Sequence, residues 1–340
     1  MDLSLFDYEL PQRLIAQEPL LERDKSKMMV LNRKTGEIKH DHFYNIVNYL
    51  NPHDIIVLNN SKVIKCRLFG IKEDTGARIE CFVLEKRTSS KAIALLRPFK
   101  KIKENSKIII NKSPIIFFDV IKKIGNGKAI VEFNDSIEKI FDKYGEMPLP
   151  PYIKNRNFDT SYYQTIYAEK DGSVAAPTAG LHFTDRLLTE LKNKKINIAK
   201  ARLDISLDTF KPIKEREIEN HKIHTEKYYL SQYNANKIKN AKLNGGNVIA
   251  IGTTTIRVLE TIMTKFGELK GSKGKTNLYI YPGYKFKIVD SIVTNFHLPK
   301  SSLIVMISAF AGRETILNAY KEAIKENYKF YSFGDCMLII

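Results

Sequence analysis

The middle of the chain, from Cys66 to about Phe141, consists almost entirely of short apolar runs separated by turn-forming residues. ARIECFVLEKR, KAIALLRP and PIIFFDVIKKI each have the length of a β-strand, and Gly, Asn, Lys or Pro residues lie between such runs. Several short strands at this spacing are typical of a small barrel or a sandwich. The sequence therefore predicts an all-β region within a chain of 340 residues, a length that favours two domains.

The regions on either side of this segment have a different pattern. Residues 1–65 hold short apolar runs that are typical of strands, and the chain beyond residue 153 alternates between predicted strands and helices. The clearest helix begins after Thr184, a good N-cap residue, and has leucines on one face. MPLPPYI, residues 147–153, predicts a stiff extended connector, because its prolines fix φ and disfavour helix in the residues before them.

The charge of the chain points to a class of partner. Lys and Arg total 55 against 38 Asp and Glu, which gives a formal net charge of +17. A protein this basic often binds a polyanion, and RNA or DNA is the first candidate. Codon bias in an AT-rich genome would also enrich Lys, Asn and Ile, so both interpretations stay open.

Other features favour a cytoplasmic protein. Charged residues within the first twenty positions argue against a secretory signal, and the longest apolar stretch, Leu303 to Ala311, is too short to span a bilayer. The three cysteines lack C-x-x-C spacing, so we expect reduced thiols. The sequence has neither G-x-G-x-x-G after a strand nor H-E-x-x-H, which argues against a dinucleotide site and a zinc protease.

Two histidines stand in small or apolar surroundings. GSVAAPTAGLHFT places His182 after a run of small side chains, and TNFHLPKS places His297 before a proline. If the first segment is extended, Leu181 and Phe183 face away from His182, which then points toward whatever lies opposite. Ala176–Gly180 would let a ligand approach the backbone closely. We therefore expect a binding floor with a proton carrier at its edge, although a single histidine is more often a satisfied core residue.

Two further polar motifs each admit several interpretations. In NHKIHTEKY, His221, His224 and Glu226 form a catalytic or substrate-binding cluster, a surface cluster or a set of metal ligands, since residues three apart share a helical face. In AIGTTTIR, Gly252 and three threonines stand where a strand turns into a helix. Free backbone N–H groups there predict an anion site, with an ordinary helix cap as the alternative.

An aromatic motif, NLYIYPGYKFK, surrounds a Pro-Gly turn and is interleaved with lysines. Tyr281 and Tyr284 in this motif are candidates for stacking on unpaired bases. Rings in such a pattern more often belong to the hydrophobic core, and the sequence favours that alternative.

Longer strings of the sequence resemble those of one family. They run in order from FDYELPQRLIAQEPLLERDKSKMMVL and NNSKVIKCRLFG through MPLPPYI, YQTIYAEKDGSVAAPTAGLHFT and HKIHTE to IGTTTIRVLE, YPGYKF, TNFHLPKSSLIVMISAFAG and YSFGDCMLI. On these strings the chain resembles the S-adenosylmethionine:tRNA ribosyltransferase-isomerase family of the queuosine pathway. The resemblance covers the whole chain except the variable barrel region.

The resemblance implies a fold and a reaction. The fold is a two-domain α/β (α+β) protein, with a discontinuous catalytic domain, 1–65 and 148–340, and an inserted small β-barrel domain, 66–147. The larger domain is expected to contain a β-barrel-like sheet wrapped by helices. The reaction transfers and isomerises the ribosyl group of S-adenosylmethionine onto 7-aminomethyl-7-deazaguanine at the tRNA wobble position, giving epoxyqueuosine, adenine and methionine. The implied partners are tRNA and S-adenosylmethionine, with no cofactor, no metal, no membrane and a monomeric protein.

This chemistry assigns candidate roles to the motifs. A base of near-neutral pKa would remove a C5′ proton acidified by the sulfonium, and an acid would assist the departure of adenine. The candidates for catalysis are His182, His297, His221, His224, Glu226 and Asp335. The candidates for substrate binding, including an anion site for the methionyl carboxylate, are Ala176, Pro177, Thr178, Ala179, Gly180, Gly252, Thr253, Thr254, Arg257, Tyr281 and Tyr284.

One segment departs from the family pattern, which usually reads like T-L-H-V-G-x-G-T-F. This chain has RLDISLDTF at 202–210, where Asp204 replaces a histidine and Ser206 and Asp208 replace glycines. Either that histidine is dispensable or a carboxylate does its work, and we transfer no catalytic role to Asp204.

Two functions of other classes compete with this interpretation. A non-catalytic RNA-binding protein would explain the charge but not the histidine-containing motifs. A metal-dependent hydrolase that uses His221, His224 and Glu226 would explain HKIHTE, but the sequence offers no further ligand motif. Metal analysis of the purified protein tests the hydrolase, and a product assay tests the RNA-binding protein.

Overall fold

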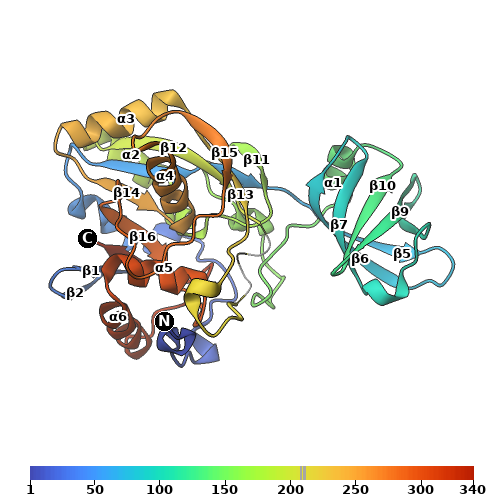
Figure 1. Ribbon diagram of the computed structural model, residues 1–340, viewed down its shortest axis with the longest axis horizontal. Coiled ribbons are helices and arrows are strands. Elements are labelled where there is room, and N and C mark those ends of the chain that lie inside the picture. Colours follow the sequence, from blue (N-terminus) through green and yellow to red (C-terminus); the bar gives the residue numbers. More distant parts are fainter. Residues whose placement is uncertain (207–208, 210–211) are drawn as a thin grey trace. The chain divides into compact units, whose positions relative to one another are not determined.

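The computed structural model of the protein describes residues 1–206, 209 and 212–340 (Figure 1). The chain forms two compact units, one from Met1–Lys62 and Pro150–Ile340 and the other from Val63–Leu149. The sequence-based domain limits, 66 and 147, stay a prediction, because a compact unit need not be a domain that folds alone.

The larger unit is built on a mixed sheet that has nine strands in the described part of the chain. In spatial order they are β15 (Ser272–Thr276), β13 (Glu226–Leu230), β12 (Asn197–Asp204), β3 (Ile55–Asn59), β14 (Val248–Ile251), β16 (Ser291–Asn295), β17 (Cys336–Ile339), β1 (Lys27–Leu31) and β2 (Ile38–His42). β3 pairs in parallel with β12 and β14, and β14 pairs in parallel with β16. β3 and β14 are buried along their whole length, which explains their continuous apolar sequences.

Hydrophobic clusters cover the two faces of this sheet. Ile55 and Val57 of β3 belong to one cluster, and Ile56 and Leu58 belong to the other, because successive strand residues point to opposite faces. The first cluster includes side chains of α3 (Gln232–Leu243), α4 (Thr253–Phe266), α5 (Ser302–Ala311) and α6 (Arg313–Lys325), and the second includes side chains of α2 (Asp185–Asn193). The shorter strands of the chain are β4 (Ser61–Val63) and β11 (Lys170–Ser173).

Two predicted helix starts are confirmed. Thr184 caps α2, since its side chain accepts a hydrogen bond from the Leu187 amide. α4 begins directly after Gly252, which itself follows β14 and has a φ of +81°. Glycine adopts this backbone conformation at little cost, so the strand can turn sharply into the helix. The predicted order of strand, glycine turn and helix is therefore present.

The smaller unit is a closed barrel whose strands in spatial order are β10 (Lys128–Phe133), β7 (Lys91–Arg97), β6 (Arg78–Lys86), β5 (Arg67–Lys72), β8 (Lys107–Lys112) and β9 (Ile115–Gly125). α1 (Ile137–Tyr144) follows the last of them. Buried and less buried residues alternate along β7 and β10, as expected when one face of each strand fills the barrel interior. Of the two all-β possibilities, the structure has the barrel.

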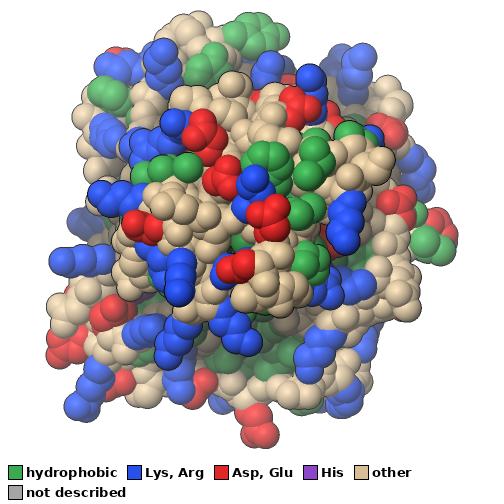
Figure 2. All heavy atoms as spheres, turned by 90° about the vertical axis from the view of Figure 1, so that its right-hand side faces the viewer, with side chains coloured by type: hydrophobic (Ala, Val, Ile, Leu, Met, Phe, Trp, Pro, Cys, Tyr) green, Lys and Arg blue, Asp and Glu red, His purple; other side chains and the backbone are tan. Residues whose placement is uncertain are grey.

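The predicted α/β class, with a small β-barrel and a larger unit of sheet and helices, is confirmed. The larger sheet, predicted to be barrel-like, runs from β15 to β2 and keeps both as edge strands in the described residues. Lys and Arg side chains are spread over the face shown in Figure 2, with Asp and Glu among them. The excess positive charge of the chain therefore lies on the surface, where a polyanion can reach it.

Candidate functional site

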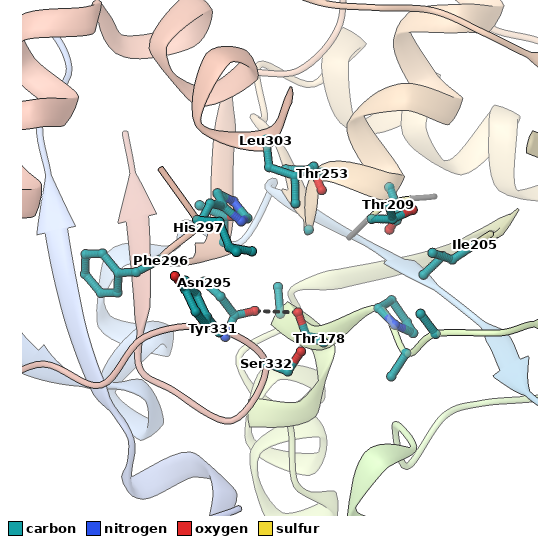
Figure 3. A pocket seen from close by; sticks show the side chains of 18 of the residues that line it. Thr178, Ile205, Thr209, Thr253, Asn295, Phe296, His297, Leu303, Tyr331 and Ser332 are labelled. Carbon is teal, nitrogen blue, oxygen red and sulfur yellow. Dashed lines mark hydrogen bonds between the residues drawn. The ribbon is translucent and has the colours of Figure 1, made fainter. Parts of the chain in front are cut away.

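An open cavity of about 600 Å³ lies in the larger unit, beside the carboxyl ends of β14 and β16 (Figure 3). Open α/β sheets commonly bind ligands at such an edge, and the volume is typical of small-molecule pockets. The lining residues are Tyr152, Ala175, Ala176, Pro177, Thr178, Ala179, Ile205, Thr209, Gly252, Thr253, Thr254, Thr294, Asn295, Phe296, His297, Leu298, Leu303, Tyr331 and Ser332. We call this space the main cavity.

The run of small residues forms part of its wall, but in a different conformation from the predicted one. The extended segment predicted around His182 is wrong, because residues Thr178–His182 form a 3-10 helix, η7, whose turns satisfy the backbone locally. The Thr178 hydroxyl donates to Asn295 Oδ1 at 2.9 Å (Figure 3). Gly180 is not among the lining residues. A Cβ there would lie 1.9 Å from the Tyr167 hydroxyl oxygen, so close packing requires this glycine.

The amino end of α4 contributes polar groups to the main cavity. Gly252, Thr253 and Thr254 line it, and the first N–H groups of a helix have no acceptor within the helix. Thr254 is 9% exposed, and its Oγ1 has no hydrogen-bond partner among the described residues. The next hydroxyl, that of Thr255, donates to Ile251 O at 2.8 Å. The cavity therefore has an unpaired hydroxyl beside the positive end of a helix dipole.

His297 follows β16 and lines the same cavity (Figure 3). Its Nε2 lies 2.7 Å from Thr294 Oγ1, its amide donates to the Tyr320 hydroxyl at 2.8 Å, and its carbonyl accepts from the Tyr8 hydroxyl. Burial lowers the pKa of His297 to about 3. The imidazole is therefore neutral at pH 7 and can accept a proton or a hydrogen bond from a ligand.

His182 is buried behind this wall and lines a second, smaller cavity of about 290 Å³. Its Nδ1 lies 2.8 Å from Ser26 Oγ, and its Nε2 lies 3.3 Å from Asn295 Nδ2. Burial, together with the positive charge of Arg23, lowers the pKa of His182 to about 4, although the Arg23 backbone opposes this shift. The two histidines thus belong to neighbouring cavities, and Asn295 lies between His182 and the main cavity.

His224, Glu226 and Arg257 form a buried cluster next to the main cavity. The Glu226 carboxylate accepts from Arg257 Nη1, lies 3.0 Å from His224 Nε2 and accepts from the Ser206 amide at 2.8 Å. Burial alone would raise the pKa of Glu226, but the hydrogen bond from His224 and the charge of Arg257 hold it below its ordinary value. Thr209, which lines the cavity, donates to Glu226 Oε1 at 3.3 Å. The cluster therefore contacts the cavity through this threonine.

His221 does not join this cluster. It follows the 3-10 helix η9 (Ile218–Asn220) in an extended conformation, so the predicted shared helical face of His221 and His224 is wrong. Its Nδ1 lies 2.8 Å from Glu215 Oε2, and its ring packs edge-on against Tyr279. A local acidic partner has separated the two histidines that the sequence places together.

Three other candidates lie outside the lining of both cavities. Asp335 accepts from the amides of Lys27 and Lys329, each at 2.7 Å, and burial raises the pKa of its carboxyl group. The Tyr284 hydroxyl donates to Glu260 Oε2 at 2.9 Å, and Tyr281 packs against the core. These contacts give the three side chains positions in the fold, and their proposed roles toward a substrate stay predictions.

The unusual carboxylate of the RLDISLDTF segment is also paired. Asp204 accepts two hydrogen bonds from Arg202, at 2.7 and 2.9 Å. It lies against Gly172, where a Cβ would come within 2.8 Å of the carboxylate. Asp208 lies outside the described residues. The described part of the segment therefore gives Asp204 a structural partner and places Ile205 on the cavity.

The sequence analysis missed several lining residues. Asn295 lies within TNFHLPKS and makes contacts toward both cavities, but its amide attracted no attention beside His297. Thr209, Tyr152 and Ser332 also line the main cavity. Their own neighbours in the sequence carry no pattern that marks a site, whereas Asn295 follows a buried strand and could have been found at its carboxyl end.

Two searches of the described residues bear on the alternatives. No group of three or more His, Cys, Asp and Glu side chains there is arranged to hold a metal ion. The helices in the same residues are all too short or too polar to cross a membrane. The first result gives the metal-dependent hydrolase no structural support, since His221 lies apart from His224 and Glu226.

Comparisons with known proteins agree with one another. The family model described as "Queuosine biosynthesis protein" matches residues 3–339. Proteins from Staphylococcus haemolyticus and Staphylococcus aureus strain JH9, both named S-adenosylmethionine:tRNA ribosyltransferase-isomerase, are 46% identical over the full length of both chains. The crystal structure of S-adenosylmethionine tRNA ribosyltransferase from Thermotoga maritima is 36% identical, with a TM-score of 0.59, and the alignment covers 99% of this chain and 100% of that one. This chain belongs to the queuosine biosynthesis protein family.

Proposed function

We propose that this chain is an S-adenosylmethionine:tRNA ribosyltransferase-isomerase that acts on 7-aminomethyl-7-deazaguanine at the wobble position of tRNA. Full-length identity of 46% to proteins of that name supports the reaction. The aminomethyl nitrogen forms a bond to a ribosyl carbon and loses a proton. The bonds from the ribosyl group to adenine and to sulfur break, so that adenine, methionine and one net proton are released.

The single structural observation that supports this function best is the polar end of the main cavity. S-adenosylmethionine carries a carboxylate, and a helix amino end with free N–H groups attracts anions. We assign the methionyl carboxylate to the amides of Thr253 and Thr254 and to the unpaired Thr254 hydroxyl. Arg257, predicted for the same role, is instead occupied by Glu226 and does not line the cavity. Ala176–Ala179 form the opposite wall.

The state of the two histidines limits their roles in proton transfer. Both are neutral at pH 7, because burial lowers the pKa of His297 to about 3 and that of His182 to about 4. A neutral imidazole suits removal of the C5′ proton, whereas protonating adenine requires a cation. We therefore assign His297, which lines the main cavity, to proton removal. Once protonated, the same imidazole is an acid for the departing adenine.

Reaction products test the function directly. Purified protein, S-adenosylmethionine and tRNA that carries 7-aminomethyl-7-deazaguanine should release adenine and methionine together, as measured by chromatography. Formation of S-adenosylhomocysteine instead would show a methyltransferase. The rate should be unchanged in a chelator, because we propose that no metal or cofactor takes part. Loss of activity that zinc restores would revive the hydrolase.

Charge supplies the second part of the proposal, a tRNA partner met in the cytoplasm by a monomeric enzyme. If Lys and Arg contact phosphates, tRNA affinity must fall steeply with salt, with a log–log slope of about 0.7–0.9 for each phosphate neutralised. S-adenosylmethionine affinity should change much less over the same range. A flat tRNA response would show that the net charge of +17 reflects codon bias rather than a binding surface.

A further inference from the structure

The second cavity has the size and lining of a site for a small group. Its volume of about 290 Å³ lies just below the range of about 300–1,000 Å³ found for pockets that hold drug-sized ligands. The lining residues are Pro19, Leu20, Arg23, Ser26, Tyr162, Leu181, His182, Ser332, Phe333 and Gly334. The space therefore suits a single ring system better than the whole of S-adenosylmethionine.

A thin wall of side chains divides this cavity from the main one. Ser332 lines both spaces. On the main side the Thr178 hydroxyl donates to Asn295 Oδ1, and on the far side of the amide Asn295 Nδ2 lies 3.3 Å from His182 Nε2. His182 in turn contacts Ser26 within the second cavity. Groups bound in the two cavities would thus be separated by one layer of polar side chains.

The chemistry of the second cavity matches a nucleobase. The Arg23 guanidinium carbon lies 4.9 Å from the centre of the Tyr162 ring, so an aromatic plane and a cationic plane face the same space. Unpaired bases stack on such planes in proteins that recognise single-stranded RNA. The hydroxyl of Ser26 and the His182 imidazole supply polar groups for the edge of a base. Apolar side chains at Leu20 and Phe333 complete the lining.

We propose that the second cavity receives the 7-deazaguanine base of the tRNA, with its aminomethyl group against the wall formed by His182, Asn295 and Ser332. The inference rests on the proposed function, which needs a donor and a base close enough for a bond to form between them. The main cavity holds the donor. The amine nitrogen then reaches the ribosyl carbon across or beside the single layer of side chains.

A tryptophan at one of two adjacent leucines tests this assignment. Leu20 lines the second cavity and is 47% exposed, whereas Leu21 does not line it and is 82% exposed. Leu20→Trp should fill the cavity and lower kcat/KM for modified tRNA by about tenfold or more, because the base can no longer enter. The affinity for S-adenosylmethionine, measured by calorimetry, should stay unchanged. Leu21→Trp should match the unmodified protein in both measurements.

A second variant removes a stacking plane instead of filling the space. Tyr162→Leu should lower the affinity of the protein for tRNA that carries 7-aminomethyl-7-deazaguanine, while the affinity for the same tRNA with guanine stays the same. Stacking contributes about 1–3 kcal/mol per base, so the preference should fall by about five-fold or more. This measurement needs no turnover and is independent of how Leu20→Trp folds.

Two results would overturn the assignment. If Leu20→Trp weakens binding of S-adenosylmethionine, the second cavity holds part of the donor. If both variants keep full turnover and full preference for the modified tRNA, the base binds elsewhere. Failure of the unmodified protein to release adenine and methionine would refute the proposed function instead, so the two failures are distinguishable.

Discussion

The main cavity and the Glu226 cluster lie side by side and treat polar groups in opposite ways. In the cluster, Glu226 accepts hydrogen bonds from Arg257, His224, the Ser206 amide and Thr209, and Arg257 Nε is the exception that stays unpaired among the described residues. In the cavity, the Thr254 hydroxyl and the first amides of α4 face space.

This difference separates a structural group of polar residues from a binding site. Buried polar groups are normally paired, so a buried pair already has what it needs, whereas an unpaired group beside a cavity leaves a hydrogen bond for a ligand. Both regions contain residue types that are typical of active sites. Only the pairing, which depends on the fold, distinguishes them.

Removing the centre of the cluster should have the largest effect on stability. Glu226→Ala leaves Arg257 buried without its carboxylate, so the free energy of unfolding should fall by about 3–5 kcal/mol. Chemical denaturation measures this change. The matched control is Glu169→Ala, because Glu169 pairs with Lys200 on the surface, where such a pair contributes about 0–1 kcal/mol. Equal losses in the two variants would show that the Glu226 cluster does not hold the fold together.

The buried histidines should make stability fall as the pH is lowered. Unfolded, each binds a proton below its ordinary pKa of about 6.5, but in the folded protein His182 stays neutral down to about pH 4 and His297 to about pH 3. The unfolded state therefore binds more protons between about pH 6.5 and 4, and stability is lost as the pH falls through this window. The expected slope is about 1.4 kcal/mol per pH unit for each histidine.

Single substitutions assign this slope to its source. His182→Gln should remove about half of the combined slope in denaturation experiments at several pH values, because glutamine does not titrate. His53→Gln, at an exposed position, is the control and should leave the slope unchanged. If His182→Gln also leaves it unchanged, the His182 imidazole is protonated in the folded protein at these pH values.

Filling the main cavity should weaken donor binding more than it weakens the fold. Ala179 lies against the α4 turn, since its Cβ is 3.6 Å from where a Cβ on Gly252 would lie. Ala179→Leu should lower the affinity for S-adenosylmethionine by about tenfold or more and cost about 1–3 kcal/mol of stability through overpacking. Ala179→Ser, which adds little volume, should stay close to the unmodified protein in calorimetry. Full affinity of the leucine variant would place the donor outside this cavity.

Local patterns predicted the parts of the site that depend on nearby residues. Gly252 and the threonines after it were found because a glycine turn between a strand and a helix is a short-range feature, and His297 stands out beside it. The sequence could not show that His182 faces Ser26 or that Thr178 contacts Asn295, because the partners are more than 100 positions apart and meet only through the order of the strands. His221 failed for a related reason: its acidic partner, Glu215, outweighed the spacing to His224.

Two adjacent threonines give the smallest and sharpest test of the comparison. Thr254 has an unpaired hydroxyl on the cavity, and the Thr255 hydroxyl is bonded to Ile251 O within the helix start. Valine has the shape of threonine without the hydroxyl. Thr254→Val should therefore leave stability unchanged or slightly raised, because an unsatisfied buried group has been removed. The affinity for S-adenosylmethionine should fall by about tenfold, the loss of one hydrogen bond to a charged carboxylate.

Thr255→Val should show the reverse pattern. Loss of its bond to the Ile251 carbonyl should lower the free energy of unfolding by about 1 kcal/mol, while the affinity for S-adenosylmethionine stays unchanged. Denaturation and calorimetry on both variants give four values in which stability and affinity exchange places. If the two variants behave alike, then the pairing of a hydroxyl in the free protein does not mark where the ligand binds, and the carboxylate must be sought away from the amino end of α4.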